Sequence, residues 1–436
     1  MATDDLLHQP ADMTNDPNPE DAASGAEAQP PAGAEPPAAP VMKTPTPPAE
    51  PSGDAHAPQR APRHWPSLIG GAVALVILTI AAFFPVKDAA FIWDDEAIYA
   101  NPVIQSPNGL RQIWLQPELN KEEPHYWPLT YTSFWIEWRL WGNNPRGYHL
   151  VNLALHAAAS LLLWGLLRRL RLPCAWLASV LFAIHPLHVE SVAWTIERKD
   201  VLMAVFYGLA LHACMSWSER GAWWSLPAAI LFTAAAILAK SMAVSIPVVA
   251  LVLIVWSTRR LRVADGLLVI FVALAAAALV GLDLRLYNPH ADGPPLNLNM
   301  LERVVLASRA AWDYAIRLVL PVGLSTIYPQ YTGLTEGVWW IWPASWVLLA
   351  GVTLLGAALR WWGGGWPAAV LIFLVTLGPI LGLIDYGFLH FSYTADRFAY
   401  LAAAVPAAGL CWIFGRLWRL RATAMRAALV LVAVAL

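Results

Sequence analysis

The sequence predicts an all-α integral membrane protein, with a bundle of about 11 transmembrane helices and a large first outward loop that carries amphipathic interface helices. Of its 436 residues, 58% are hydrophobic and only 13% are charged, and the mean hydropathy is positive. Soluble domains carry about twice that share of charged residues. The apolar residues also gather in runs near 20 residues long, which is the length that crosses the hydrocarbon core of a bilayer.

The predicted spans follow from these apolar runs. They are 68–86, 149–166, 175–192, 201–217, 223–239, 242–256, 265–282, 338–359, 367–384, 398–414 and 427 onward. The segment 301–320 is a doubtful twelfth because charged residues recur along it. It suits a helix that lies at the interface or lines a cavity.

Two parts of the chain are predicted. Residues 1–66 are rich in Pro, Ala and acidic residues with almost no large apolar side chain, so we expect a disordered cytoplasmic tail. Residues 67–436 form the polytopic membrane domain, with its first outward loop at 87–148. The chain stops inside an apolar run at Leu436, so we expect a truncated product or a following outward-facing region.

Charge sets the orientation and excludes one class of partner. With the tail inside, the basic clusters at 168–173, 218–220, 258–262 and 416–426 all fall on the cytoplasmic side. The formal net charge is −2 and the basic residues are scattered, which excludes nucleic acid as a partner.

The three cysteines, Cys174, Cys214 and Cys411, lie in apolar runs and are expected to be small buried side chains.

An acidic turn follows the first span directly. In "FIWDDEAIYANP", residues 91–102, Asp94 and Asp95 stand next to Glu96 and are flanked by Trp93 and Tyr99. One acid here would serve as a helix N-cap, which is the simpler interpretation. Mutual repulsion and partial desolvation would also raise the pKa of one aspartate, and a carboxylate tuned in this way is a usable general base.

A second polar stretch, "FAIHPLHVESVAWTIERKD" at 182–200, follows a proline break at Pro186. We expect His185, His188 and Glu190 to face a water-filled cavity, because irregular backbone at membrane depth must be solvated or buried in protein. A lone HxxH pattern is weak evidence for a metal, and no HExxH pattern is present. No metal is therefore assigned, although a divalent ion is an alternative that the pattern leaves open.

Cations on the outward side are candidate anion-binding groups. Arg198 lies at the outer mouth, Lys240 falls in a short turn of "AILAKSMAVSIP", and Arg397 follows Asp396 in "HFSYTADRFAYL". The alternatives are snorkelling for Arg198 and Lys240, and a local ion pair of Arg397 with Asp396. In "YWPLTYTSFWIEWRLWG", residues 126–142, aromatic side chains predict an amphipathic helix on the outer leaflet, or equally a helix packed against its neighbours.

Together these stretches resemble membrane glycosyltransferases of the GT-C type, and among them the transmembrane-and-tetratricopeptide O-mannosyltransferases and their bacterial relatives. The resemblance rests on "FIWDDEAIYANP", "YWPLTYTSFWIEWRLWGNNPRGYHLVNLALHA", "HPLHVESVAWTIERKDVL", "AKSMAVSIP" and "ADRFAYL", and it covers residues 91–401. It implies a GT-C-like bundle, a polyprenyl-phosphate sugar as donor, and a catalytic acid in the first outward loop, at Asp94 or Asp95. It also implies a tetratricopeptide-repeat domain after the last span, and that domain is missing here.

The expected function is therefore transfer of a sugar, mannose by resemblance, from a polyprenyl phosphate to a hydroxyl of an outward-facing acceptor. Asp94 is the first choice as base and Asp95 the helper or substitute. Arg198, Arg397 and Lys240, in that order, would receive the phosphate, with inversion at the sugar and no further cofactor. His185, His188, Glu190, Asp396 and Trp93 would line the substrate cavity.

The expected location is the inner membrane of a bacterium, with the N-terminus cytoplasmic and the active site periplasmic. The acceptor is a protein Ser or Thr in this interpretation. Transfer to a glycan or lipid, transport of the lipid-linked sugar, and a non-catalytic scaffold are the alternatives. Transporters commonly show internal repeats, and the two halves of this chain show no convincing similarity to each other.

Overall fold

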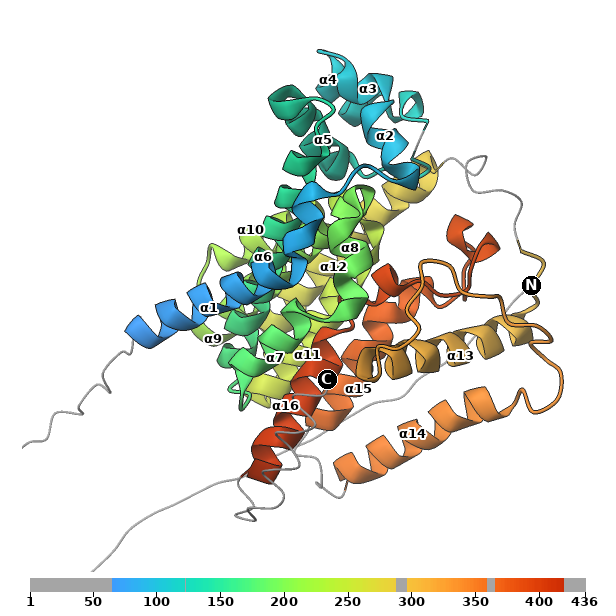
Figure 1. Ribbon diagram of the computed structural model, residues 1–436. Helices are drawn as coiled ribbons and strands as arrows, with labels where there is room; N and C mark the ends of the chain where they lie inside the picture. The colour runs from blue at the N-terminus through green and yellow to red at the C-terminus, as the bar shows by residue number, and fades with distance from the viewer. Residues whose placement is uncertain (1–64, 122, 288–295, 359–364, 419–436) are drawn as a thin grey trace, which may run out of the picture. The chain divides into compact units, whose positions relative to one another are not determined.

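The computed structural model describes residues 65–121, 123–287, 296–358 and 365–418, and in this part of the chain the backbone forms helices and turns without any strand (Figure 1). The predicted all-α class is confirmed. Residues 1–64 of the predicted tail at 1–66 and the predicted span from 427 lie outside the described residues. The longer helices are α1 (Trp65–Phe83), α6 (Pro145–Arg169), α9 (Arg198–Arg220), α10 (Ser225–Ala239), α11 (Ile246–Thr258), α12 (Val263–Leu286), α13 (Met300–Val319), α14 (Ile341–Ala358), α15 (Gly365–Leu377) and α16 (Ala404–Trp418).

Six helices in the described residues are long and apolar enough to cross a membrane, so the chain is a multi-pass membrane protein. A bent pair of helices raises this number to seven, and three shorter apolar helices accompany them at Ser225–Ala239, Gly365–Ile380 and Ala404–Gly415. Every predicted span before residue 427 coincides with one of these helices. The predicted count of about 11 spans stays a prediction, because the shorter helices do not meet the length on their own.

The bent pair is the predicted break at Pro186. Helix α7 (Ala175–Ala183) ends just before the proline, whose ring cannot continue a helix. A 3₁₀ turn, η4 (Pro186–His188), then leads into α8 (Val189–Ala193), and the two segments meet at an angle of 46°. A second 3₁₀ turn, η5 (Thr195–Glu197), joins α8 to α9. The break therefore places a run of polar residues between two apolar helices.

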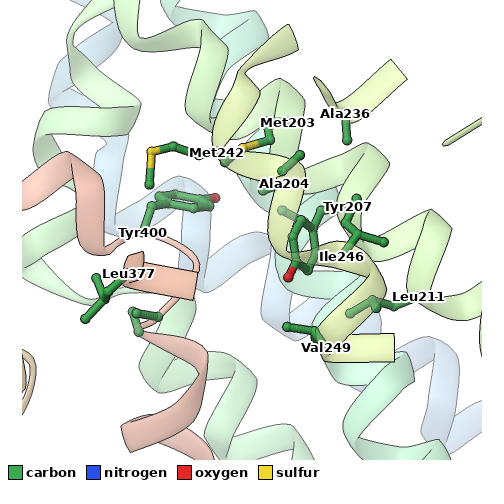
Figure 2. Packing of buried hydrophobic residues seen from close by; sticks show 14 of the residues in the cluster. Met203, Ala204, Tyr207, Leu211, Ala236, Met242, Ile246, Val249, Leu377 and Tyr400 are labelled. Carbon is green, nitrogen blue, oxygen red and sulfur yellow. The ribbon is translucent and has the colours of Figure 1, made fainter. Parts of the chain in front are cut away.

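The hydrophobic core surrounds α9, which packs against α6, α10 and α11. Figure 2 shows Met203, Tyr207 and Leu211 of α9 facing Ile246 and Val249 of α11. Met242 and Tyr400 pack into the same cluster. Small residues allow close approach of α6 and α9, because a Cβ on Gly208 would lie 3.0 Å from Leu162. This packing fixes the outward end of α9, where its charged residues begin.

The segment 87–148, which the sequence analysis predicts as the first outward loop, folds into a layer of its own. Its helices are α2 (Glu96–Tyr99), α3 (Pro102–Gln105), α4 (Gly109–Leu115) and α5 (Pro128–Trp141), and Figure 1 shows them grouped together. Ile98, Ile104, Tyr131 and Phe134 form a separate buried cluster here. Helix α5, predicted as an amphipathic segment, packs against α4, α6 and α10. The packing interpretation of this segment is therefore the one that the contacts favour.

Helix α13 covers the doubtful segment 301–320. It buries Leu306, Ala310 and Tyr314 on one face, whereas Met300 and Ile316 are exposed. It is not among the helices apolar enough to cross a membrane, in agreement with the prediction that it does not span.

The cysteine prediction holds for Cys214 and Cys411, which are buried, and is wrong for Cys174, which is exposed in the turn before α7.

The outward layer depends on close backbone contact at Gly109, where a Cβ would lie 2.0 Å from the Val103 carbonyl oxygen. We expect Gly109→Ala to displace α4 from α3 and to destabilise the protein by roughly 1–3 kcal/mol. Thermal unfolding of the detergent-solubilised protein measures this. Gly70→Ala is the matched control, because a Cβ there meets nothing within 4 Å. Equal unfolding temperatures for the two variants would contradict the packing described for the loop.

Candidate active site

The acidic turn is the 3₁₀ segment η2 (Trp93–Asp95), and it divides the two aspartates between different environments. The Asp95 side chain is fully buried, and its two carboxylate oxygens accept the N–H groups of Ile92 at 2.9 Å and Ile196 at 2.8 Å. Asp94 is exposed. Trp93 adopts φ 43°, a left-handed conformation that is strained for a bulky residue and is common at functional sites.

Burial raises the pKa of Asp95 to about 6, and the charges of Asp94 and Glu197 add to this. The raised pKa expected of one of the two aspartates thus belongs to Asp95, the buried residue, whereas the first choice as base is Asp94. Because Asp95 bonds the backbone of η5, it ties the first outward loop to the N-terminal end of α9. Asp95 therefore positions the turn, and Asp94 is the carboxylate that is left exposed.

Trp194 connects this turn to Arg397. The Trp93 and Trp194 rings pack edge to face with centroids 5.5 Å apart, and the Arg397 guanidinium carbon lies 5.4 Å from the Trp194 ring. Arg397 itself belongs to the 3₁₀ turn η10 (Asp396–Ala399), more than 200 residues further along the chain. Ring contacts through Trp194 thus connect the acidic turn to Arg397, whereas the prediction that these residues form one outward-facing site stays a prediction.

Behind Trp194 lies a buried cluster of charges, which we call the charge cluster. Arg397 pairs with Glu190 and lies 3.4 Å from Glu197, measured from Nε to Oε1. The Lys240 ammonium lies 2.6 Å from Asp200 and 3.5 Å from Glu197. Its members are Glu123, Glu190, Glu197, Lys199, Asp200, Lys240 and Arg397, with Lys199 placed 3.7 Å from Glu197 and 3.8 Å from Glu123.

Arg198 does not belong to the charge cluster, and this corrects its place as first candidate for the phosphate. Its fully buried guanidinium pairs with both oxygens of Glu137 on α5 and also donates to Asn152 and to the Tyr148 carbonyl. These partners accept hydrogen bonds from the N–H groups of the planar guanidinium, so the protein itself occupies its donors. Arg198 neither snorkels nor faces an outer mouth. It joins α5 and α6 to the first turn of α9.

The alternative interpretations of Lys240, as a snorkelling side chain, and of Asp396, as the local partner of Arg397, are both wrong. Lys240 is buried rather than snorkelling, and its partners are carboxylates, so its position is that of a paired internal cation. Asp396 does not form the alternative ion pair with Arg397, because the Arg397 side chain pairs with Glu190. Asp396 instead accepts a hydrogen bond from the Tyr328 hydroxyl at 2.8 Å, and burial raises its pKa. Asp396 therefore links the turn η10 to the loop that carries Tyr328.

The histidines do not line an open cavity together. His188 is fully buried, with its ring 4.5 Å from that of Tyr400, which corrects the expectation that it faces water. His185 is half-buried and caps η4 by accepting the Leu187 N–H, while its other ring nitrogen lies 3.1 Å from the Leu318 carbonyl. Glu190 pairs with Arg397 instead. Among the described residues, no group of three or more His, Cys, Asp or Glu side chains is arranged so that it could hold a metal ion.

Several residues of the site escaped the sequence analysis. Glu123, Glu137, Glu197, Lys199 and Asp200 carry most of the pairing, and none was singled out as a candidate. One signal was present, because "ERKD" at 197–200 places four charged residues in a row within an otherwise apolar chain. Such a run at membrane depth must find partners, since an unpaired charge there is costly. Its partners come from distant segments and leave no local pattern.

The Arg198–Glu137 pair gives a stability prediction. We expect Arg198→Ala to cost roughly 3–5 kcal/mol, because it leaves the Glu137 carboxylate buried without its counter-charge. The double change of Arg198→Met with Glu137→Leu should cost less than the single change, since no uncompensated charge is left. Unfolding temperatures in detergent measure both. Lys87→Ala, at the exposed pair of Lys87 with Asp88, is the control and should change little.

Comparison with known proteins finds relatives that match part of this chain. The chain is 35% identical over 182 residues to the human protein O-mannosyl-transferase TMTC4, and 32% identical over 187 residues to the Drosophila melanogaster protein O-mannosyl-transferase Tmtc1. These matches cover 36% and 41% of this chain but only 24% and 22% of the relatives, so the chain spans about a quarter of their length. No family model and no solved structure matches. The predicted resemblance is confirmed in these terms: curated relatives of this chain, at 27–35% identity, are protein O-mannosyl-transferases.

Proposed function

We propose that this chain is the membrane-embedded part of a glycosyltransferase that moves mannose from a polyprenyl phosphate to a hydroxyl of a protein acceptor. The observation that carries the proposal is the tie from Asp95 to the Ile196 N–H, at 2.8 Å. It joins the turn that carries the exposed Asp94 to the backbone next to Glu197, and three cations surround Glu197. The names of the relatives give the class of reaction and of acceptor.

The reaction needs two kinds of group at one place. An acceptor hydroxyl that attacks the anomeric carbon must lose a proton, and the bond to the phosphate oxygen breaks as positive charge develops on the sugar. Asp94 takes the hydroxyl proton as general base. Arg397, Lys199 and Lys240 stabilise the departing phosphate, which leaves with the electron pair of the broken bond. Direct displacement of this kind inverts the anomeric centre.

The membrane setting fits such a donor. A polyprenyl chain lies in the bilayer and its phosphate lies at the surface, so the enzyme must hold charged groups where apolar helices end. The charge cluster lies at the ends of α8, α9 and α10, which is this position. We place this face in the periplasm of a bacterium, with the N-terminus in the cytoplasm, on the distribution of Lys and Arg.

The first test is Asp94→Asn, which keeps the shape of the side chain and removes the proton acceptor. We expect transfer to fall by about 10²–10⁴-fold, which is the usual contribution of a general base. The assay incubates purified protein with a panel of polyprenyl-phosphate sugars and reads the acceptor by mass spectrometry. Glu96→Gln, an exposed acid at the next turn, is the matched control. Full transfer by Asp94→Asn would remove this residue from the role of base.

A second test uses the pKa of Asp95. Its ionised carboxylate holds the Ile196 N–H, so we expect kcat to fall as pH drops through about 6, where Asp95 takes up a proton. Because this pKa is raised from 3.8 in the folded state, the folded protein binds more protons than the unfolded chain in that window. Stability therefore rises as the pH falls, opposite in sign to the activity.

As the pH falls, activity should fall while stability rises. This difference distinguishes protonation of Asp95 from acid unfolding as the cause of a loss of activity. The pH profile of kcat is measured together with the unfolding temperature, for the wild-type protein and for Asp95→Asn. The variant should be less active and should lack the acidic limb near pH 6. Loss of activity that parallels loss of structure, or an unchanged acidic limb in Asp95→Asn, would refute the positioning role.

A further inference from the structure

Glu197 has an environment unlike that of the other acids in the charge cluster. Its side chain is 3% exposed, and three cations surround it, with Arg397 at 3.4 Å, Lys240 at 3.5 Å and Lys199 at 3.7 Å. Charge-assisted hydrogen bonds of this kind are normally about 2.7–2.9 Å long. Asp200 is the side-chain hydrogen-bond neighbour of Glu197. The three cations therefore act on this carboxylate through their charge rather than through short hydrogen bonds.

The cations around Glu197 have other partners. Lys240 makes a 2.6 Å contact with Asp200, and Arg397 pairs with Glu190, which also accepts the Arg397 backbone N–H at 3.0 Å. Lys199 lies 3.8 Å from Glu123. Withdrawal of Glu197 would leave each of these contacts in place. No other carboxylate of the cluster faces three cations in this way among the described residues.

The charge cluster disfavours a further anion. Its four carboxylates, Glu123, Glu190, Glu197 and Asp200, already outnumber the three cations, which are Lys199, Lys240 and Arg397. An added phosphodiester anion would increase this excess of negative charge in a low-dielectric site, which is unfavourable. Exchange of one carboxylate for the phosphate avoids the increase.

We propose that Glu197 is the internal counter-ion of the donor phosphate site, and that the phosphate of the polyprenyl-phosphate sugar takes its place among Lys199, Lys240 and Arg397. This inference rests on the proposed function and names the residue that the donor displaces. Glu197 directly follows Ile196, whose N–H holds Asp95. A phosphate at this position therefore lies beside the acidic turn, as in-line attack on the attached sugar requires.

The exchange has consequences at both ends of the reaction. In the empty protein, Glu197 offsets the mutual repulsion of the three cations that surround it. After transfer, the same carboxylate competes with the polyprenyl phosphate product for the cations and so promotes its release. Its presence weakens donor and product binding, and its removal should strengthen both.

The test is the affinity of Glu197→Gln for polyprenyl phosphate, measured by quenching of tryptophan fluorescence or by calorimetry in detergent. We expect the affinity to rise by about tenfold or more, equivalent to about 1.4 kcal/mol or more. We also expect kcat to fall while KM for the donor falls, because product release becomes slower. A residue with only a structural role would weaken binding when changed, so tighter binding is the discriminating result.

Two further variants complete the experiment. Glu197→Met removes the charge without introducing an amide that needs partners, and it should also bind polyprenyl phosphate more tightly. Glu219→Gln removes one carboxylate at the Arg169 pair on the other end of α9, and its affinity should equal that of the wild type. Unchanged or weaker binding in both Glu197 variants, with normal binding by the wild type, overturns the counter-ion role alone. Absence of polyprenyl phosphate binding by the wild type overturns the proposed function itself.

Discussion

The pairing of buried charges is the constraint on which the rest of this structure depends. A charge that leaves water for the interior of a helical bundle is stable only beside an opposite charge, and the partner must come from wherever the fold can supply it. Here Arg198 draws α5 to α9, Lys240 draws the end of α10 to the same helix, and Arg397 joins η10 to α8. The outward end of the bundle is held by these ties, whereas the remainder is held by apolar packing.

The breaks in the helices follow from the same constraint. Short 3₁₀ turns stand at η4, η5, η6 (Ser241–Ser245) and η10, next to the residues that carry charge. A continuous helix would direct successive charged side chains around its whole circumference, including toward lipid. A break in the helix allows several charged side chains to point into the same part of the protein. The backbone groups that the break frees bond within the protein, as the Ile196 N–H does with Asp95.

The sequence predicts the helices well and the pairings poorly, for physical reasons. Crossing a membrane is a local property, so hydropathy places the apolar helices and Pro186 places the break. Pairing is not local, since 61 residues separate Arg198 from Glu137 and 207 separate Arg397 from Glu190. Adjacent residues also diverge, because successive positions on a helix point about 100° apart. Arg198 therefore turns to α5 and α6, while Lys199 turns to Glu123 and Glu197.

The same reasoning explains why two adjacent aspartates have different roles. A loop that must deliver a carboxylate to a substrate needs both a free group and a fixed backbone, and one side chain cannot supply both. Asp95 bonds two backbone N–H groups and is buried, which fixes the turn and leaves Asp94 exposed. The strained φ of Trp93 is sustained by this anchoring and by the contact of its ring with Trp194. Under the proposed function, the cations of the site are already compensated and the Asp94 base is held beside them. Donor binding then exchanges one anion for another, and Glu197, which lies among three cations, is the carboxylate that the phosphate displaces.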